Sequence, residues 1–450
     1  MTASGKLLAG LCAAALLAGC TVRDDTGIAG TVSSPQAVLG ADWPDYGEAS
    51  VPSGFSPAGV AALEARMARF VTDGDTPGLA TLLVRDGEVV SHVHAGLADV
   101  ETGAPVAEDT IYRIYSMTKP VTGVALMMLY EEGAFSLDDP VSKFIPEFRD
   151  LQVLGAPGAA GEWTLEPLSR QPTLRELMSH TAGFAYGLDG DDPANAAFRD
   201  EQIMASPDLD SFIDRVAGVP LLYQPGEEWF YSAAVDIQGA IIERITGQSL
   251  GEFFDERLFG PLGMDDTGFY VPAGDYDRLA DLFAIDPENG AVVPYETPGT
   301  AFRKETIAME SGGGGLVSTL DDYARFCQML AGGGALDGVR ILQPETVELM
   351  RTDVLPEGVT IDLAGTLSDE QATSAKFGLD FGVYTDTAAN DLPFGEGTYY
   401  WGGAAGTWFW IDPENDLFFI GMIQLFDQQD PDPTDFWSVS AEKVYAALEE

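Results

Sequence analysis

The stretch Ser116-Met117-Thr118-Lys119 places a serine hydroxyl and a lysine amine at a spacing that can support acyl transfer. The apolar residues after it repeat at three- and four-residue steps, which predicts a helix that begins near Ser116 and ends at Gly133. Lys119 then lies on the same helix face as Ser116, with Cβ atoms about 5–6 Å apart. A serine becomes a nucleophile when a base takes its proton, and a lysine whose pKa is lowered by burial can be that base. The helix start also offers backbone N–H groups for an oxyanion.

Two other serine motifs point to structural roles. The Ser-x-x-Lys spacing recurs at Ser440 and Lys443, where we expect two solvated polar residues on a surface helix. Gly-x-Ser-x-Gly around Ser249 is typical of a nucleophile elbow, but such an elbow needs a strand before it. Here a helix is predicted on both sides, and none of the three histidines follows Ser249. We therefore expect Ser249 to be non-catalytic.

Four further polar features are candidates for the site. His180 follows a predicted helix over 174–179, where it is either a base or, as we expect, a packing residue that caps the helix end. Tyr231 stands between a loop and an apolar helix, where a phenol can point into a cleft. The glycine run 312–315 lacks the Gly-Lys-Ser/Thr of a phosphate loop and predicts a turn before a helix capped by Ser318 or Thr319. His92 and His94 share one strand face, but no third ligand with zinc-like spacing follows, so we expect neither metal nor cofactor.

Composition excludes some function classes. The chain has 450 residues, 46% of them hydrophobic, which is enough for a large core. There are 23 basic and 72 acidic residues, and this net charge of -49 disfavours nucleic-acid binding. Such acidity suits salty surroundings, where screening shortens the reach of self-repulsion. With only Cys12, Cys20 and Cys327, no disulfide framework is expected, and Cys327 is predicted to be a buried core thiol.

The N-terminal region predicts export. Residues 1–19 combine Lys6 with an apolar run that is too short to span a membrane stably, as in a signal peptide. The end of this run, followed by Cys20, resembles a bacterial lipobox, which implies cleavage before Cys20, its acylation and a membrane anchor. The alternative is an ordinary signal peptide with an incidental cysteine. We expect a lipoprotein on the periplasmic face of a bacterial membrane, or a protein secreted otherwise, with residues 20–54 as a flexible tether.

The remaining pattern predicts one hydrolase domain over residues 55–450. Its expected elements are a helix at 57–73, strands at 78–85, 88–95, 377–384, 397–402, 406–412 and 417–424, and a helix at 436–448. Strands at both ends with helices between them predict a part that contains the sheet, built from about 55–145 and 335–450. A mostly helical sub-domain, about 146–334, is inserted in it, with a cleft between the two.

Three short sequence motifs follow one another along the chain in an order that is typical of a known family. They are Ser116-x-x-Lys119, Tyr231-Ser232-Ala233 and Trp401-Gly402-Gly403-Ala404. With the segments 179–183, 263–267 and 312–316, they resemble the serine β-lactamase and penicillin-binding-protein superfamily, and above all the family VIII carboxylesterases with their class C β-lactamase fold. The resemblance implies an α+β fold of the β-lactamase/transpeptidase type, with an antiparallel sheet flanked by helices.

The resemblance also implies roles for these residues. Ser116 would be the acylated nucleophile, Lys119 its proton acceptor, and Tyr231 the relay to the leaving group. The backbone N–H groups of Ser116 and Ala404 would form the oxyanion hole, with Trp401, Gly402 and Gly403 beside the substrate. Whether Lys119 or Tyr231 is the general base stays open.

Two departures from β-lactamases favour esters. Ala233 stands where those enzymes carry Asn, and Trp401-Gly402-Gly403 stands where they carry Lys-Thr-Gly. The polar clamp for a β-lactam is thereby lost, and a Trp supplies an apolar wall. We therefore predict a carboxylesterase for short acyl or aryl esters. The alternatives are a D-amino peptidase, transpeptidase or weak β-lactamase acting on cell-wall-like amides, and a non-catalytic binding protein that uses the same cleft. The oligomeric state stays open.

Overall fold

The computed structural model describes residues 39–40, 43–44, 54–158, 162–188, 190–286, 288–361, 374–426 and 435–449. The predicted signal peptide, Cys20 and most of the predicted tether lie outside these residues. Within the tether range, however, Leu39 donates its backbone N–H to Asp337, and Trp43 is buried edge-on against Phe418. This part of residues 20–54 is therefore docked on the domain, because Trp43 buries a large apolar ring there.

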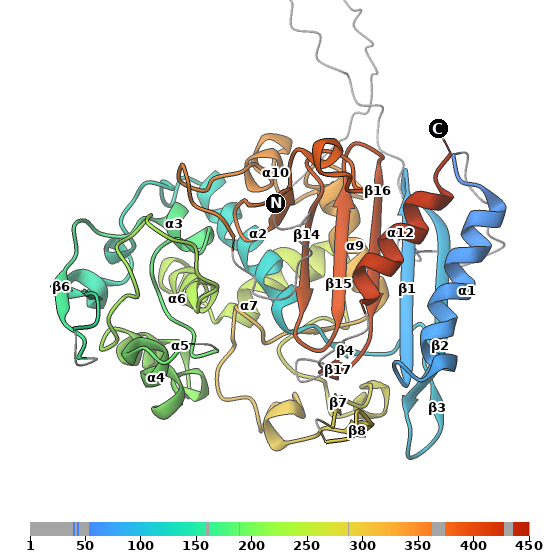
Figure 1. The fold of residues 1–450 in the computed structure, drawn as a ribbon, viewed down its shortest axis with the longest axis horizontal. Coiled ribbons are helices and arrows are strands. Elements are labelled where there is room, and N and C mark those ends of the chain that lie inside the picture. Colours follow the sequence, from blue (N-terminus) through green and yellow to red (C-terminus); the bar gives the residue numbers. More distant parts are fainter. Residues whose placement is uncertain are drawn as a thin grey trace, which may run out of the picture. The chain divides into compact units, whose positions relative to one another are not determined.

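Strands from both ends of the chain form one eight-stranded sheet in the order β12-β13-β14-β15-β16-β1-β2-β3 (Figure 1). Neighbouring strands are antiparallel, and β1 joins β16 with Ala80 opposite Met422. The strands are β1 (Gly78–Arg85), β2 (Glu88–Asp99), β3 (Ala104–Pro105), β12 (Ala375–Phe377), β13 (Gly382–Tyr384), β14 (Tyr399–Gly403), β15 (Thr407–Asp412) and β16 (Leu417–Met422). The predicted α+β class and the antiparallel sheet built from both termini are confirmed.

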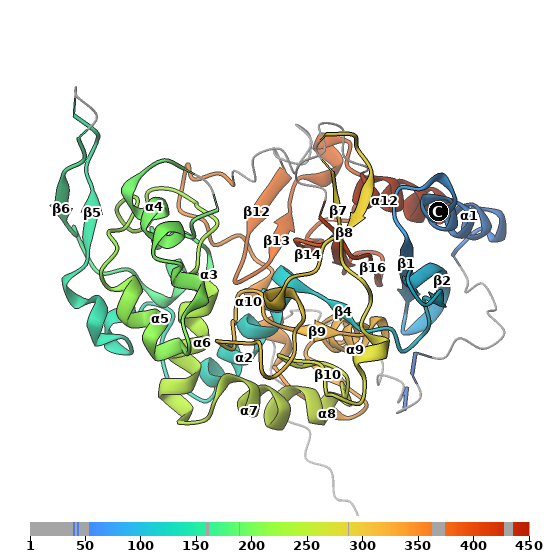
Figure 2. The ribbon, with the colours of Figure 1, turned by 90° about the horizontal axis from the view of Figure 1, so that it is seen from below.

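Helices cover both faces of this sheet. Helices α1 (Pro57–Asp73) and α12 (Phe436–Ala447) pack side by side on one face, and α9 (Leu320–Ala331) lies on the other (Figures 1 and 2). Helix α1 has the predicted bounds because Ser56 caps its first turn and Gly74 ends it with a φ of 89°. Its apolar residues, at three- and four-residue steps, turn one buried stripe toward the sheet.

The middle of the chain is mostly helical. Its core is α2 (Thr118–Glu131), which packs against α6 (Ala234–Thr246). The other helices are α3 (Leu174–Met178), α4 (Pro193–Asp200), α5 (Leu209–Val216), α7 (Leu250–Phe254), α8 (Gly260–Leu262) and α10 (Pro344–Met350). Short strands accompany them: β4 (Tyr112–Arg113), β5 (Gln152–Leu154), β6 (Leu165–Pro167), β7 (Phe283–Ile285), β8 (Val292–Pro294), β9 (Val317–Ser318), β10 (Ala335–Leu336), β11 (Val339–Arg340) and β17 (Leu425–Phe426).

Two sequence predictions about the C-terminal part are wrong in detail. The single strand expected at 377–384 is two strands, β12 and β13, which pair with each other across a turn. Asp380 makes this turn with a φ of 62°, a backbone conformation that Asp tolerates better than most residues. Ser440 is buried rather than solvated, since it accepts a hydrogen bond from the Trp408 indole N–H at 3.2 Å.

Within the described ranges, none of the helices combines the length and the apolar character that a membrane crossing requires.

Candidate active site

Ser116 lies at the junction between the sheet and α2. It is the middle residue of a short 3-10 helix, Tyr115–Met117, that runs directly into α2. Backbone hydrogen bonds hold the segment from both sides, because Ile114 N–H donates to Leu316 and Leu316 N–H donates to the Thr118 hydroxyl. The predicted helix start is therefore present, and Ser116 stands at its N-terminus, half-buried.

Lys119 lies one turn further, as the spacing predicts. Its side chain is fully buried, and its Nζ donates to Ser116 Oγ at 3.2 Å, to the Tyr186 hydroxyl at 3.4 Å and to the Gly313 carbonyl at 2.6 Å. The Gly313 carbonyl comes from the glycine run 312–315. That run was predicted only as a turn, but here it supplies a carbonyl that orients the ammonium.

Tyr231 approaches Ser116 from the helical part. Its hydroxyl donates to Ser116 Oγ at 2.7 Å, and its ring centroid lies 4.6 Å from Lys119 Nζ. Four other rings surround the phenol: His180 at 5.1 Å, Tyr186 and Trp401 at 5.6 Å and Trp229 at 6.3 Å between centroids. Tyr231, more than a hundred residues further along the chain, and Lys119, one helical turn away, thus both hydrogen-bond to the Ser116 hydroxyl oxygen.

The protonation of Lys119 is set by opposing effects. Burial lowers the pKa of Lys119, whereas Tyr186, Tyr231 and the Asp236 carboxyl raise it, and the net shift is upward. The Lys119 amine is therefore an ammonium at neutral pH. Ser116 Oγ then accepts hydrogen bonds from both Lys119 and Tyr231 in the resting site, and the cluster must lose one proton before it can accept another from Ser116.

His180 packs against the site without acting as its base. Its Nδ1 accepts a hydrogen bond from the Ser232 N–H at 3.2 Å. Burial, and next the charge of Lys119, lowers the pKa of His180 well below its usual value. A neutral, fully buried imidazole beside the Tyr231 ring positions that ring, as the packing interpretation expects.

A buried carboxyl supports the Gly313 carbonyl from behind. Asp236 on α6 accepts hydrogen bonds from the Ser311 hydroxyl at 2.5 Å and from the Gly313 N–H at 3.1 Å. A Cβ on Gly313 would lie 2.5 Å from Asp236 Oδ2, so a side chain there would displace this carboxyl. Asp236 thereby fixes the peptide that orients Lys119.

Strand β14 places Trp401 next to Tyr231 and the proposed oxyanion turn next to the segment that leads to Ser116. Trp401 is buried with its ring beside Tyr231, and Gly402 and Gly403 complete the strand. A Cβ on Gly403 would lie 2.3 Å from the Ile114 carbonyl, so only glycine allows β14 to approach the segment before Ser116 this closely. The exposed Ala404 follows directly in the turn to β15.

The sequence motifs missed Tyr186 and Asp236. Tyr186 comes after the Ser179–Gly183 segment, and no periodicity marks it. Asp236 did carry a signal, since it is an acidic residue in the otherwise apolar first turn of α6.

The other sequence candidates lie elsewhere. Ser249 caps α7 in a reciprocal arrangement with Glu252, and Thr319 caps α9. Cys327 is fully buried in the core, as predicted. His92 and His94 lie on β2, and no group of three or more His, Cys, Asp or Glu in the described part of the chain is arranged to hold a metal ion.

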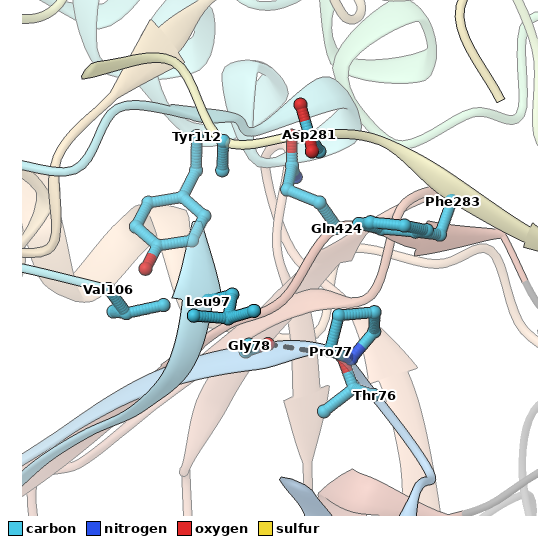
Figure 3. Close-up of a pocket in the computed structure, with 10 residues that line it drawn as sticks. Thr76, Pro77, Gly78, Leu97, Val106, Tyr112, Asp281, Phe283 and Gln424 are labelled. Carbon is cyan, nitrogen blue, oxygen red and sulfur yellow. Dashed lines mark hydrogen bonds between the residues drawn. The ribbon is translucent and has the colours of Figure 1, made fainter. Parts of the chain in front are cut away.

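One small cavity is separate from this site. Figure 3 shows it between the start of β1 and the region of Tyr112, Asp281 and Gln424. Its volume of about 10 Å³ has room for about one water molecule. Neither Ser116 nor Tyr231 lines it, so this cavity is too small and in the wrong place for a substrate.

Comparisons with known proteins agree with this arrangement. The model of the beta-lactamase family matches residues 63–441. Protein Rv1367c of Mycobacterium tuberculosis is 36% identical over 365 residues, covering 77% of this chain and 85% of that protein. Esterase EstB of Burkholderia gladioli is 34% identical over 353 residues, covering 74% of this chain and 82% of that protein. The structure of EstCE1, described as a hydrolase with promiscuous acyltransferase activity, matches with a TM-score of 0.70 at 26% identity, over 86% of this chain and 99% of that one.

Proposed function

Since the chain belongs to the beta-lactamase family, we propose that it is a serine hydrolase that forms an acyl-enzyme on Ser116 and hydrolyses carboxylic esters. The observation that carries the proposal is the pair of hydrogen bonds on one oxygen, from Tyr231 at 2.7 Å and from Lys119 at 3.2 Å. Two titratable groups on a serine hydroxyl, at the start of a helix, suit acyl transfer.

The proposed reaction has two steps. When the Lys119–Tyr231 pair has lost a proton, Ser116 Oγ attacks the ester carbonyl and its own proton passes to the pair. The oxyanion is held by the N–H groups of Ser116 and Ala404, and Tyr231 protonates the departing alcohol oxygen. Water then attacks the acyl-enzyme while the same pair takes its proton. As the bond between the acyl carbon and Ser116 Oγ breaks, the pair gives this proton to Oγ, and the carboxylic acid departs.

Ester specificity is supported by what surrounds Tyr231. The buried Ala233 caps α6 where a β-lactam amide would need a polar partner, and the Trp401 ring lies beside the phenol. An apolar wall favours the alcohol part of an ester over the carboxylate of a β-lactam. The name of the relative EstB is in keeping with this choice.

Acyl transfer to an alcohol is a second candidate, because EstCE1 is described as having promiscuous acyltransferase activity. It uses the same acyl-enzyme, and the second step then takes an alcohol in place of water. A product assay with p-nitrophenyl butyrate and increasing concentrations of an alcohol distinguishes the two. Butyrate as the sole product at every concentration excludes transfer.

The test of the main proposal joins labelling and turnover. Intact mass spectrometry after a fluorophosphonate probe is expected to show one adduct on the wild type and none on Ser116→Ala. The same two proteins are then assayed with p-nitrophenyl butyrate, nitrocefin and a D-alanyl peptide, and turnover of the ester alone is expected. Absence of an adduct on folded protein favours a binding protein, and faster turnover of nitrocefin or of the peptide than of the ester favours an amide substrate.

A further inference from the structure

Two strained aromatic residues meet beside the proposed nucleophile. Among the described residues, ten non-glycine positions have a positive φ, and six of these are aspartates. Tyr115 and Phe302 are in this set, with φ of 41° and 47°, and their rings meet edge to face at 5.8 Å. Bulky side chains rarely adopt this conformation, and such strain gathers at functional sites.

A continuous group of rings extends from this pair, which we name the aromatic platform: Tyr115, Phe302, Phe426 and Tyr295. The Phe426 ring lies 5.4 Å from that of Tyr115 and 5.5 Å from that of Tyr295. Tyr295 is 45% exposed, whereas Tyr115 and Phe426 are half-buried. The platform therefore has an exposed ring at Tyr295 and reaches, through Phe426, the half-buried Tyr115 that precedes Ser116.

The platform residues are next to both halves of the proposed oxyanion hole along the backbone. Tyr115 is the residue before Ser116 in the chain. Phe426 lies on β17, where its neighbour Leu425 donates its N–H to the Ala405 carbonyl at 2.9 Å, next to Ala404. A substrate carbonyl held by Ser116 and Ala404 is thus adjacent to the platform.

The direction of each substrate group follows from the residues around the carbonyl. The oxyanion points to the N–H pair, and the leaving oxygen must reach Tyr231. The rings around Tyr231 belong to a different group, which includes His180, Tyr186 and Trp401. The remaining substituent of the carbonyl carbon is the acyl chain, and the remaining side is that of Tyr115 and Phe426.

We infer that the aromatic platform binds the acyl chain and makes the enzyme prefer alkyl and aryl acyl groups longer than acetyl. This inference rests on the proposed esterase function and adds the acyl side of the substrate. Each methylene transferred fully from water to an apolar surface favours binding by about fourfold. On a half-open platform, the four methylenes that separate hexanoate from acetate are expected to give about a tenfold preference.

The test measures kcat/KM for p-nitrophenyl acetate, butyrate and hexanoate, which share one leaving group. It is repeated with phenyl and p-nitrophenyl acetate, which share one acyl group. The variants are Tyr295→Ala, Phe426→Ala and Tyr115→Gly. Glycine keeps the positive φ at position 115 without strain and removes only the ring. Trp163→Ala is the matched control, because Trp163 is 40% exposed and lies next to the distant β6 strand (Figure 2).

The platform variants are expected to lower the hexanoate-to-acetate ratio severalfold and to leave the phenyl-to-p-nitrophenyl ratio unchanged, while Trp163→Ala changes neither. If circular dichroism shows that Tyr115→Gly or Phe426→Ala does not fold, the hexanoate-to-acetate ratio of Tyr295→Ala is the test. Tyr295 is exposed, so its replacement is expected to leave the fold intact. If the hexanoate-to-acetate ratio is unchanged in folded variants, or if the phenyl-to-p-nitrophenyl ratio changes, the inference that the platform binds the acyl chain is wrong, while the proposed esterase function stands. A wild type that turns over none of these esters overturns the proposed function and this inference with it.

Discussion

Replacement of Gly403 by alanine tests how the sheet positions the oxyanion hole. Gly403 ends β14 opposite Thr407, and the added Cβ would lie 2.3 Å from both the Ile114 carbonyl and the Thr407 hydroxyl. Ordinary contact begins at 3.4 Å, so β14 must move by about 1 Å from the segment that leads to Ser116. This movement separates the Ala404 N–H from the Ser116 N–H, which the proposed mechanism needs at one oxygen.

The expected result is a loss of about 10²-fold in kcat/KM for p-nitrophenyl butyrate, since a 1 Å misplacement or the loss of one oxyanion donor has about that effect. Overpacking is expected to lower the free energy of unfolding by about 1–3 kcal/mol, measured by urea denaturation. The protein must remain folded in the activity assay, which near-UV circular dichroism shows.

Two further alanine variants test whether the loss of activity follows the distance from the added Cβ to its nearest atom. At Gly402 the nearest atom would be the Thr407 carbonyl oxygen at 3.2 Å, so Gly402→Ala is expected to lose less activity than Gly403→Ala. At Gly274 no atom lies within 4 Å, so Gly274→Ala is the control with wild-type activity. The reasoning is refuted if Gly403→Ala keeps activity within about threefold of the wild type while Gly274→Ala is normal.

Four more predictions concern the site and the surface. Because its raised pKa keeps Lys119 protonated at neutral pH and the base form needs one proton fewer, kcat/KM is expected to rise about tenfold per pH unit above neutrality. A pH–rate profile that is flat from about pH 6 to about pH 9 contradicts this. Tyr231→Phe is expected to lose about 10²-fold or more in kcat, and Tyr186→Phe less, since the Tyr186 hydroxyl is hydrogen-bonded to Lys119 whereas that of Tyr231 donates to Ser116 itself. Equal losses in steady-state assays would place Tyr186 in the reaction itself. Ser249→Ala should keep full activity and lose about 1 kcal/mol of unfolding free energy, because it removes only the cap of α7. Inactive but folded Ser249→Ala would reopen the choice of nucleophile. With a net charge of -49, the melting temperature should rise from about 0.05 M to about 1 M NaCl, and a fall over that range contradicts charge repulsion as a limit on stability.

Local rules predict much of the fold from the sequence. The bounds of α1 and β1 follow from a capping serine, a helical apolar stripe and the Asp86-Gly87 turn, whose φ values of 52° and 78° suit a two-residue hairpin. The predicted strand at 377–384 is wrong because a tight turn at Asp380 interrupts it, and the turn residues Asp380, Gly378 and Gly382 in the sequence are compatible with that turn. In a buried run, periodicity alone does not distinguish one strand from two.

For the site, the sequence by itself determined the pair Ser116 and Lys119, because one helical turn relates them and helix geometry is local. The loop-to-helix junction marked Tyr231 as a candidate, but its role, and the place of Trp401 in the site, could be proposed only through resemblance, since more than a hundred residues separate each from Ser116. Tertiary packing alone decided that Tyr186 and the Asp236-supported Gly313 carbonyl surround the amine, and that Tyr186 and Asp236 raise the pKa of Lys119. It also decided that the rings of Tyr115 and Phe302 meet edge to face. These contacts join α2, α6, β14 and the loops between them, and only the burial of those elements against one another brings their side chains to one oxygen.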